Sequence, residues 1–326
     1  MKWIIKKQLC IIFCCTIGLS VFSTACGGDD DEDDEITGEN AVRMQEFVKD
    51  ISSYARGIKS DFIIIPQNGI ELAFNDTDPD EGIMSSYISA INGVGVEELF
   101  YDGSLSPDNE RLSMLRKLKP YVTVMVSDFV ENNANITDAI QKNKNEGFIS
   151  FPRSSDNYDY MLIPTTITDE NENDIVKLSD AKNYLYLISF DEFGTKQDMI
   201  SAIAATNYDV VLIDLFFEGK ELTSADIQSL QTKKNGAKRL LIAYVSIGSA
   251  ENYRYYWQKE WEKGNPSWIK KNYEGYPDEF WVEFWHPDWK NIIYGNNQSY
   301  IKKIIDAGFD GAYLDNVEAY YFLTND

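Results

Sequence analysis

The stretch Gly308-Phe309-Asp310-Gly311-Ala312-Tyr313-Leu314-Asp315-Asn316-Val317-Glu318-Ala319-Tyr320 gives the strongest indication of architecture in this 326-residue chain. A helix-like segment from Ser299 to Ala307 precedes it, and a turn at Gly308 leads into a short apolar strand that stops at Asp315. In α/β barrels the carboxyl ends of the strands meet at the mouth of the active site, so an acid in this position indicates catalysis. Asp315 is therefore the first candidate catalytic residue, and the rest of the chain has to supply its partner.

The first 25 residues have the pattern of an export signal. A positively charged segment, residues 2–7, precedes an apolar run at 9–21 that is too short for a typical membrane-spanning helix. The following Ser23-Thr24-Ala25-Cys26 resembles a lipoprotein signal-peptidase site, although Ser23 stands where Leu is commoner. We therefore expect a signal peptide over residues 1–25 and lipidation of Cys26. Cleavage would remove the other three cysteines, which leaves no disulfide framework and no thiolate metal site.

An acidic run follows the lipidation site. Residues 27–35 are two glycines and seven acids, a composition typical of solvated, disordered chain, so we predict an acidic tether over residues 26–40. A plain spacer is one interpretation. The other is a surface-export signal, because the run resembles those of surface-displayed lipoproteins in some Gram-negative bacteria. The expected location is the cell envelope, as an outer-membrane lipoprotein exposed at the surface.

Residues 41–326 are long enough for one large domain. The formal net charge of the chain is −23, which argues against a nucleic-acid partner because phosphates would be repelled. The same charge allows attraction to a cationic polymer, although acidity that merely keeps a surface protein soluble is an equal alternative.

Short apolar runs alternate with helical periodicity along this domain, which predicts a parallel sheet with helices outside it. Many strands end in Asp, Glu, Asn or Gln, and this favours a closed TIM (β/α)8 barrel over an open sheet. Nine candidate strands stand where eight are needed, so either 148–151 or 281–284 should lie outside the barrel. Residues 153–182 interrupt the alternation with an irregular polar segment that is unusually long for a connection. The predicted strands are 62–65, 94–96, 121–126, 148–151, 184–189, 210–213, 240–245, 281–284 and 312–314.

Carboxylates are the available catalysts. The mature chain has a single histidine, His286, without a nucleophile-elbow or a Gly-rich phosphate-binding sequence, so we interpret His286 as structural. Glu97, Asp128, Asp214 and Asp315 fall at predicted strand ends, and a glycosidase needs two carboxyl groups. Asp128 and Asp214 could equally contact the catalytic side chains without touching the substrate. Acids alone could also hold Mg²⁺ or Ca²⁺, an alternative that stays open, but our prediction is a site without metal or cofactor.

Aromatic residues point to the same chemistry. Every tryptophan of the mature chain lies between Trp257 and Trp289, interleaved with tyrosines, and flat faces with polar edges suit stacking on sugar rings. The alternative is that this segment packs its own small aromatic core. Arg254, near Glu251, is either a substrate contact or a structural ion-pair partner.

Taken together, several short segments of the sequence resemble glycoside hydrolase family 114, whose members are endo-α-1,4-polygalactosaminidase-type TIM barrels. Each piece is short, but the set is specific and spans nearly all of residues 41–326. The matching pieces are 65–69, 96–101, 209–214, 243–248 with Glu251, Tyr253, Arg254 and Trp257, 285–289, and 308–315.

The order of these pieces differs from the usual order in the family. In relatives the pieces at 65–69 and 96–101 follow the Leu-Asp motif of 314–315, whereas here they precede it. The resemblance therefore implies a circularly permuted barrel with new termini in the loop after Tyr320. Residues 153–182 would join the old ends, and chains tolerate permutation at exposed loops.

The resemblance implies that Asp315 and Glu97 are the catalytic acids, with their roles as nucleophile and acid/base left open. Glu97 is preferred to Glu98 because it directly ends the apolar strand. Asp191 stands where relatives often carry Gln, which bears on the details of the substrate. The expected substrate-binding residues are Asp214, Tyr244, Ser246, Gln67, Asn68, Arg254, Trp257, Trp285, Asp128 and Tyr320.

The sequence thus predicts a surface-anchored glycoside hydrolase of the family-114 type. Its expected partners are a polysaccharide or oligosaccharide, with cationic, galactosamine-containing polymers as candidates, and the outer membrane through the lipid anchor. Two alternatives stay open: a non-catalytic glycan-binding surface lipoprotein, and an acid-lined, metal-dependent hydrolase.

Overall fold

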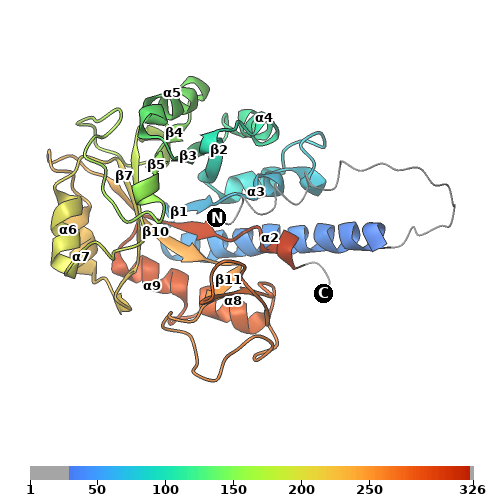
Figure 1. Ribbon diagram of the computed structural model, residues 1–326. Helices are drawn as coiled ribbons and strands as arrows, with labels where there is room; N and C mark the ends of the chain where they lie inside the picture. Colours follow the sequence, from blue (N-terminus) through green and yellow to red (C-terminus); the bar gives the residue numbers. More distant parts are fainter. Residues whose placement is uncertain (1–28, 324–326) are drawn as a thin grey trace.

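The structure is a computed structural model that describes residues 29–323. Parallel strands form the centre of the molecule and helices lie outside them, as predicted (Figure 1). One sheet has the order β1-β14-β10-β7-β6, and a second has the order β2-β3-β4 with β5 also paired to β3. These strands are β1 (Ile63–Pro66), β2 (Gly93–Leu105), β3 (Thr123–Val130), β4 (Ile149–Ser150), β5 (Arg153–Ser154), β6 (Tyr184–Leu187), β7 (Val210–Asp214), β10 (Leu240–Ser246) and β14 (Gly311–Asp315).

The helices bury apolar faces against these strands. In α9, Tyr300, Ile301, Ile304 and Ala307 are buried at helical spacing, and the helix ends at Gly308, whose φ of 100° few other residues tolerate. The helices are α2 (Asp29–Ile58), α3 (Ser85–Ala90), α4 (Asn109–Leu118), α5 (Ile136–Glu146), α6 (Lys196–Ala204), α7 (Ser224–Leu230), α8 (Pro287–Ile293), α9 (Tyr300–Ala307) and α10 (Ala319–Phe322).

The two parallel sheets meet along one side. β14 is hydrogen-bonded to β1 and to β10, so the strand that ends in Asp315 lies in the interior of its sheet. β1 continues to β2 through a parallel bridge between Gln67 and Gly95. Within residues 29–323 no strand ladder joins β4 to β6, but the rings of Phe151 and Tyr184 lie 5.5 Å apart across that side. This mixed α/β arrangement is compatible with a TIM-like fold.

Tyrosines fill the space between the sheets. Tyr186 on β6 donates a hydrogen bond to Oε1 of Gln67 at 3.0 Å, and its ring meets Tyr313 of β14 edge-on at 5.6 Å. Gly95 on β2 makes room for this layer, because a Cβ there would lie 1.8 Å from the Tyr313 hydroxyl. The glycine is thus required by the close approach of a strand and a ring from opposite sheets.

The surplus predicted strand is the one at 281–284. It corresponds to β13 (Glu279–Val282), which lies in a separate antiparallel sheet between β11 (Ser249–Glu251) and β12 (Ile269–Asn272). β4 pairs with β3 and belongs to the parallel set. β2 is longer than predicted because its pairing with β3 resumes after an irregularity between Glu97 and Asp102.

The predicted helix at 41–56 is part of α2, and its apolar face is buried through Met44, Phe47, Val48 and Ile51. The tether predicted over residues 26–40 overlaps α2, because residues 29–40 form the first turns of that helix. The helix extends because negative charge is favourable at a helix N-terminus, and Glu39 pairs with Arg43 one turn later. The predicted signal peptide and Cys26 lie outside the described residues. Among the helices that the structure describes, none has the length and apolar character needed to span a membrane.

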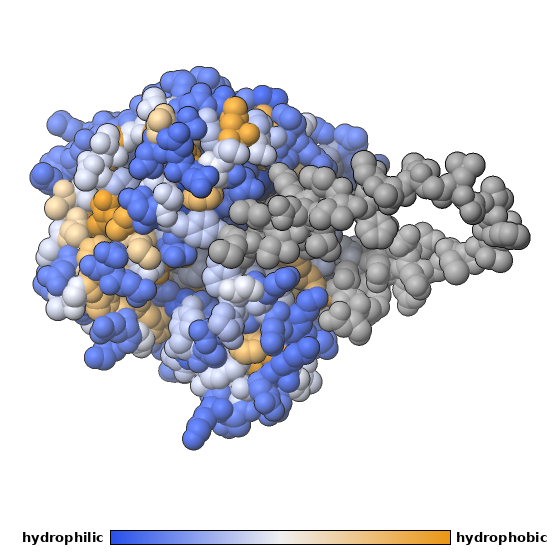
Figure 2. Space-filling model, viewed as in Figure 1, coloured by the Kyte–Doolittle hydropathy of each residue, from blue (hydrophilic) through white to orange (hydrophobic). Residues whose placement is uncertain are grey.

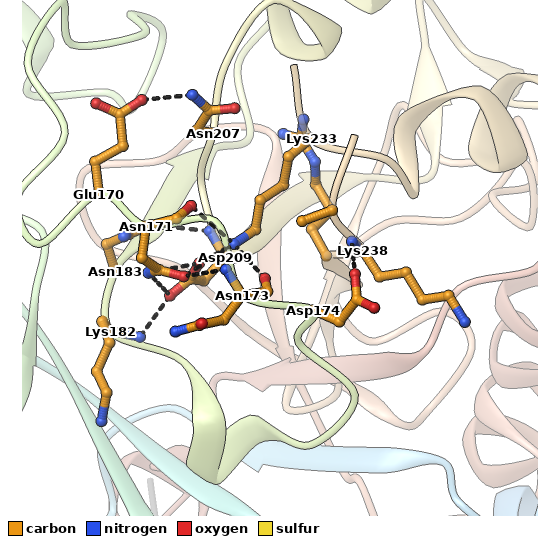
Figure 3. A network of polar contacts seen from close by, with 12 residues as sticks. Glu170, Asn171, Asn173, Asp174, Lys182, Asn183, Asn207, Asp209, Lys233 and Lys238 are labelled. Atoms are coloured by element: carbon orange, nitrogen blue, oxygen red, sulfur yellow. Dashed lines mark hydrogen bonds and ion pairs between the residues drawn. The ribbon is translucent and has the colours of Figure 1, made fainter. Parts of the chain in front are cut away.

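Residues 155–182 contain only short 3-10 turns, yet they are firmly attached to the sheet. Lys233 Nζ lies 2.6 Å from Oδ1 of Asp209, and both side chains are wholly buried (Figure 3). Lys233 also donates to the carbonyl of Asn173, while Asn171 and the backbone N–H of Lys182 donate to Asp209. Because Asp209 precedes β7, this Asp209–Lys233 network closes the end of the sheet opposite to Asp214.

Candidate active site

The carboxyl ends of the parallel strands surround a cavity of about 1660 Å³. Residues of the segment from β11 to β13 line it as well. The face of the molecule shown in Figure 2 is mostly hydrophilic. Both predicted catalytic acids, Asp315 and Glu97, line this cavity. The other lining residues at strand ends include Gln67, Asn68, Glu98, Ile188, Ser189, Asp214, Tyr244 and Asn316.

Asp315 ends β14 and is held through both carboxylate oxygens. The buried Tyr244 hydroxyl donates to Oδ2 at 2.5 Å, and the backbone N–H of Asn316 donates to Oδ1 at 2.7 Å. Burial, and then the charge of Asp315, raise the pKa of Tyr244 well above its ordinary value. The phenol therefore stays protonated and acts as a donor throughout the neutral range.

Asn316 fixes the chain just after Asp315. Its φ of 60° is unusual for a residue other than glycine, and such strained residues persist only where the surroundings hold them. Nδ2 of Asn316 donates to Oε1 of Glu279 at 2.9 Å and lies 2.9 Å from the hydroxyls of Ser246 and Ser249. Oδ1 accepts from the Tyr273 hydroxyl at 3.1 Å. The β11–β13 sheet is thus connected directly to the end of β14.

Glu97 lies at the irregularity of β2 and is held by a different part of the chain. The Tyr160 hydroxyl donates to Oε1 at 2.6 Å, and the Arg153 guanidinium lies 3.7 Å from the same oxygen. The backbone N–H of Glu97 donates to Oδ1 of Asn68 at 3.2 Å. Both proposed catalytic carboxylates therefore accept a hydrogen bond from a buried tyrosine.

Two further carboxyl groups, those of Glu98 and Glu318, line the same cavity, and neither was among the predicted site residues. Burial, and then the charge of Glu97, raise the pKa of Glu98 to about 7. Burial, and then the charge of Asp315, raise the pKa of Glu318 to about 8. A carboxyl with such a pKa keeps a proton near neutrality, as proton-donating groups in active sites do. The available signals were their positions in the sequence, directly after Glu97 and three residues after Asp315.

Asp214 and Arg254, both predicted to bind substrate, line the cavity but are paired with each other. Arg254 lies 2.7 Å from Asp214 and 2.6 Å from Glu251, and all three side chains are nearly inaccessible to solvent. Burial raises the pKa of Asp214, and Arg254 opposes that rise. The guanidinium is therefore held as a structural bridge between two carboxylates in the cavity wall.

The aromatic residues on the lining of the cavity are mostly tyrosines and phenylalanines, with few tryptophans. Trp257 stacks on Phe280 at 5.2 Å, and the ring of Trp285 lies under the guanidinium of Arg43 at 4.6 Å. Neither lines the cavity, and both instead pack against neighbouring side chains, so their predicted contact with substrate stays a prediction. Among the tryptophans of residues 29–323, Trp281 alone lines the cavity. Exposed aromatic rings on the lining come from Tyr253, Tyr255, Tyr276 and Tyr321.

Asp128, Ser246 and Tyr320, which were predicted as substrate contacts, also do not line the cavity. Asp128 is fully buried and accepts from the backbone N–H groups of Phe100 and Tyr101. The reason is that β3 continues to Val130, so Asp128 lies within the strand and not at its end. The Tyr320 hydroxyl lies 3.5 Å from Oε2 of Glu71, and the Ser246 hydroxyl accepts a hydrogen bond from Nδ2 of Asn316.

His286 caps α8, as a structural histidine would: its Nδ1 accepts from the backbone N–H of Asp288 at 3.2 Å. Asp191 lines the cavity and is exposed. In the described part of the chain, no group of three or more His, Cys, Asp or Glu residues is placed to hold a metal ion.

Comparison with known proteins gives one family. The model of glycoside-hydrolase family GH114 matches residues 165–326, the half of the chain that contains β6, β7, β10 and β14. An uncharacterized protein of Methanocaldococcus jannaschii is 35% identical over 153 residues, which cover 47% of this chain and 41% of that protein. Uncharacterized proteins of Thermotoga maritima and Deinococcus radiodurans are 30% and 34% identical over 37% and 39% of this chain, and over 36% and 39% of their own lengths. The chain thus spans about two fifths of the length of these relatives.

Proposed function

The chain belongs to glycoside hydrolase family GH114, and we propose that it cleaves a polysaccharide by using Asp315 and Glu97 as its working pair of carboxyl groups. One observation supports this proposal above the others. The two acids come from the ends of β14 and β2, line the same cavity, and each accepts a hydrogen bond from a buried tyrosine hydroxyl. Glycoside hydrolysis needs such a pair on either side of the scissile bond.

The charge of the cavity supports a cationic substrate, and we propose a polymer that contains galactosamine with free amino groups. Acidic residues on the lining outnumber basic residues, and focused negative potential attracts protonated amines. The acids are Glu97, Glu98, Asp159, Asp191, Asp214, Glu218, Glu251, Glu274, Glu279, Asp315 and Glu318, and the bases are Arg153, Arg254 and Lys271.

Incubation with a panel of amino-sugar polymers, followed by mass analysis of the products, tests the activity and the substrate together. We expect cleavage of de-N-acetylated polygalactosamine and slower cleavage of its acetylated form. Asp315→Asn and Glu97→Gln should each lower the rate by about 10²–10⁴-fold. Asp159→Asn is the matched control, because Asp159 is an exposed acid on the same lining. No cleavage of any polymer by the unaltered protein would contradict the proposal.

A non-catalytic glycan-binding protein is the second candidate, and the exposed tyrosines on the lining favour it equally. Tyr253 and Tyr321 are 62% and 54% exposed and offer ring faces to a sugar whether or not a bond is cut. A binding protein would retain the polymer in a pull-down assay and release no products. An enzyme would release products, and its Asp315→Asn variant would retain the polymer.

We further propose that the eight strands β1, β2, β3, β4, β6, β7, β10 and β14 form a closed barrel whose chain order is permuted. The family model begins at residue 165, and the strands that would complete a barrel precede it, with β1 paired to β14. Since both halves contribute to one cavity, residues 41–326 would be a single domain. A chain rearranged so that residues 41–152 follow residue 323 should fold and cleave the same polymer; failure to fold in any linker length would contradict the permutation.

We also propose that the protein is anchored through Cys26 to the outer membrane and faces the exterior. The support is the signal sequence, the lipoprotein-type cysteine and the following acidic run. Cys26→Ser should move the protein from the membrane fraction to the soluble fraction. Protease added to intact cells should digest the anchored protein, and complete protection would contradict surface exposure.

A further inference from the structure

The segment that connects β5 to β6 delivers a residue to the proposed active site. Tyr160 lies in this irregular stretch, is buried, and donates its hydroxyl hydrogen to Oε1 of Glu97 at 2.6 Å. The hydroxyl also lies 2.9 Å from the Ser127 hydroxyl, and its ring stacks on Tyr186 with centroids 3.8 Å apart. A segment that served only to join two halves of a barrel would not require a side chain at this point.

The backbone at Tyr160 is built to hold this position. Its φ of 55° lies in the left-handed region, which is a genuine outlier for a bulky aromatic residue. The Asn157 side chain stabilises the turn that contains Tyr160, because it accepts a hydrogen bond from the N–H of Leu162 and donates one to the Leu162 carbonyl. The Tyr160 carbonyl accepts from the N–H of Ile188, which follows β6. The strain is thus supported on both sides, as expected where a conformation serves a function.

Arg153 contacts Glu97 and the neighbouring Glu98. Its guanidinium lies 2.5 Å from Oε1 of Glu98 and 3.7 Å from Oε1 of Glu97, and it is nearly inaccessible to solvent. It also lies over the ring of Tyr160 at 4.9 Å. Glu98 has a φ of 56°, so the backbone next to Glu97 is strained as well.

The direction of the hydrogen bond at Glu97 is set by the environment of the phenol. Burial raises the pKa of Tyr160 well above its ordinary value, and Glu97 adds to the rise although Arg153 opposes it. The phenol therefore remains a donor at every pH at which the protein would work. A fixed donor of this kind holds a carboxylate in one rotamer, and misplacement of a reacting group by 1 Å can cost a large factor in rate.

We propose that Tyr160 and Arg153 are positioning residues that hold Glu97 in its reactive orientation, so that the connecting segment is part of the active site. This inference rests on the proposed function of Glu97 as one of the two working carboxyl groups. It predicts that loss of the Tyr160 hydroxyl affects the chemical step more than it affects substrate binding, because the side chain is buried and its hydroxyl donates to the acid.

Tyr160→Phe removes only the hydroxyl and is the decisive variant. Tyr87→Phe is the matched control, because Tyr87 is equally buried, does not line the cavity, and its hydroxyl has no hydrogen-bond partner among residues 29–323. With de-N-acetylated polygalactosamine as substrate, kcat of Tyr160→Phe should fall about tenfold or more while KM changes less than about twofold. Tyr87→Phe should match the unaltered protein, and Arg153→Lys should keep more of kcat than Arg153→Met.

A second measurement needs no substrate. Urea unfolding of Tyr160→Phe, Glu97→Gln and the double variant forms a double-mutant cycle, and the effects should be non-additive because the two groups are in contact. The cycle of Tyr87→Phe with Glu97→Gln should be additive. If the unaltered protein cleaves polymer but Tyr160→Phe keeps its kcat and KM, the inference fails and the proposed function stands. If no polymer is cleaved, the proposed function fails, and additivity at Tyr160 and Glu97 would then overturn the inference independently.

Discussion

The hydroxyl of Tyr244, on β10, donates a hydrogen bond to Oδ2 of Asp315 at the end of the adjacent strand β14. The two strands are parallel and in register, with Tyr244 opposite Tyr313, so the phenol reaches forward along the sheet to the acid. The donor and its acceptor are therefore fixed by the strand pairing itself and do not depend on a loop.

This contact leads to the first prediction. Tyr244→Phe should lower kcat by about tenfold to a hundredfold, because a hydrogen bond to a charged group contributes about 1.5–3 kcal/mol. KM should change little, since the phenol supports the acid and not the sugar. Steady-state kinetics on the cleaved polymer measure both constants. A rise in KM with kcat unchanged would place Tyr244 among the groups that bind substrate.

The second prediction concerns pH and Glu318. Its folded-state pKa of about 8 lies above the ordinary value of 4.5, so the folded state holds the proton more tightly than the unfolded state. This group therefore favours folding most below about pH 4.5, and its contribution is lost as pH rises through 8. Gln stays neutral at every pH, so Glu318→Gln avoids the cost of burying an ionised carboxylate. The variant should therefore be more stable than the unaltered protein by about 1–3 kcal/mol at pH 9. Urea unfolding at pH 5 and pH 9 tests the difference; equal effects at both pH values would contradict the raised pKa.

The Asp209–Lys233 network leads to the third prediction. Lys233→Met leaves Asp209 buried without its cation, and breaking a buried ion pair in this way costs about 3–5 kcal/mol. Lys234→Met is the control, because the neighbouring Lys234 is exposed and surface changes are usually within about 0.5 kcal/mol. Equilibrium urea unfolding compares the two. Equal stabilities would show that the segment from 165 to 182 is held by other contacts.

The fourth prediction tests the close approach of β2 to the tyrosine layer. Gly95→Ala would put a methyl group 1.8 Å from the Tyr313 hydroxyl, so it should destabilise the fold by about 3 kcal/mol or more. Gly57→Ala is the matched control: this glycine lies in α2 with nothing within 4 Å of its Cβ position. Alanine should stabilise that helix by about 1 kcal/mol. Similar melting temperatures for the two variants would contradict the packing described here.

The parts of the site that could be predicted from the sequence follow from simple strand geometry. Asp315, Glu97 and Asp214 reach the cavity because parallel strands bring their carboxyl ends together. Asp128 does not, because β3 runs on to Val130, and a short apolar run does not show where pairing stops. Trp257 does not line the cavity because composition alone cannot separate an aromatic core from an exposed platform.

Other parts depend on contacts between residues far apart in the chain. Tyr160 lies in a segment without hydrophobic periodicity, and its left-handed backbone has no sequence signature of the kind that glycine would give. Its partner, Glu97, is 63 residues away. The raised pKa values of Glu98 and Glu318 likewise arise from burial and from neighbouring charges, which only the assembled fold creates.

The most direct test of the central claim is a comparison of initial rates of polymer cleavage by the unaltered protein, Asp315→Asn, Glu97→Gln and the double variant. If the two acids act on one bond, each single change should lower the rate by about 10²–10⁴-fold, and the double variant should be no more than slightly slower than the worse single variant. Either single variant retaining most of the parental rate would contradict the claim. So would losses that multiply in the double variant, because the two carboxyl groups would then act independently.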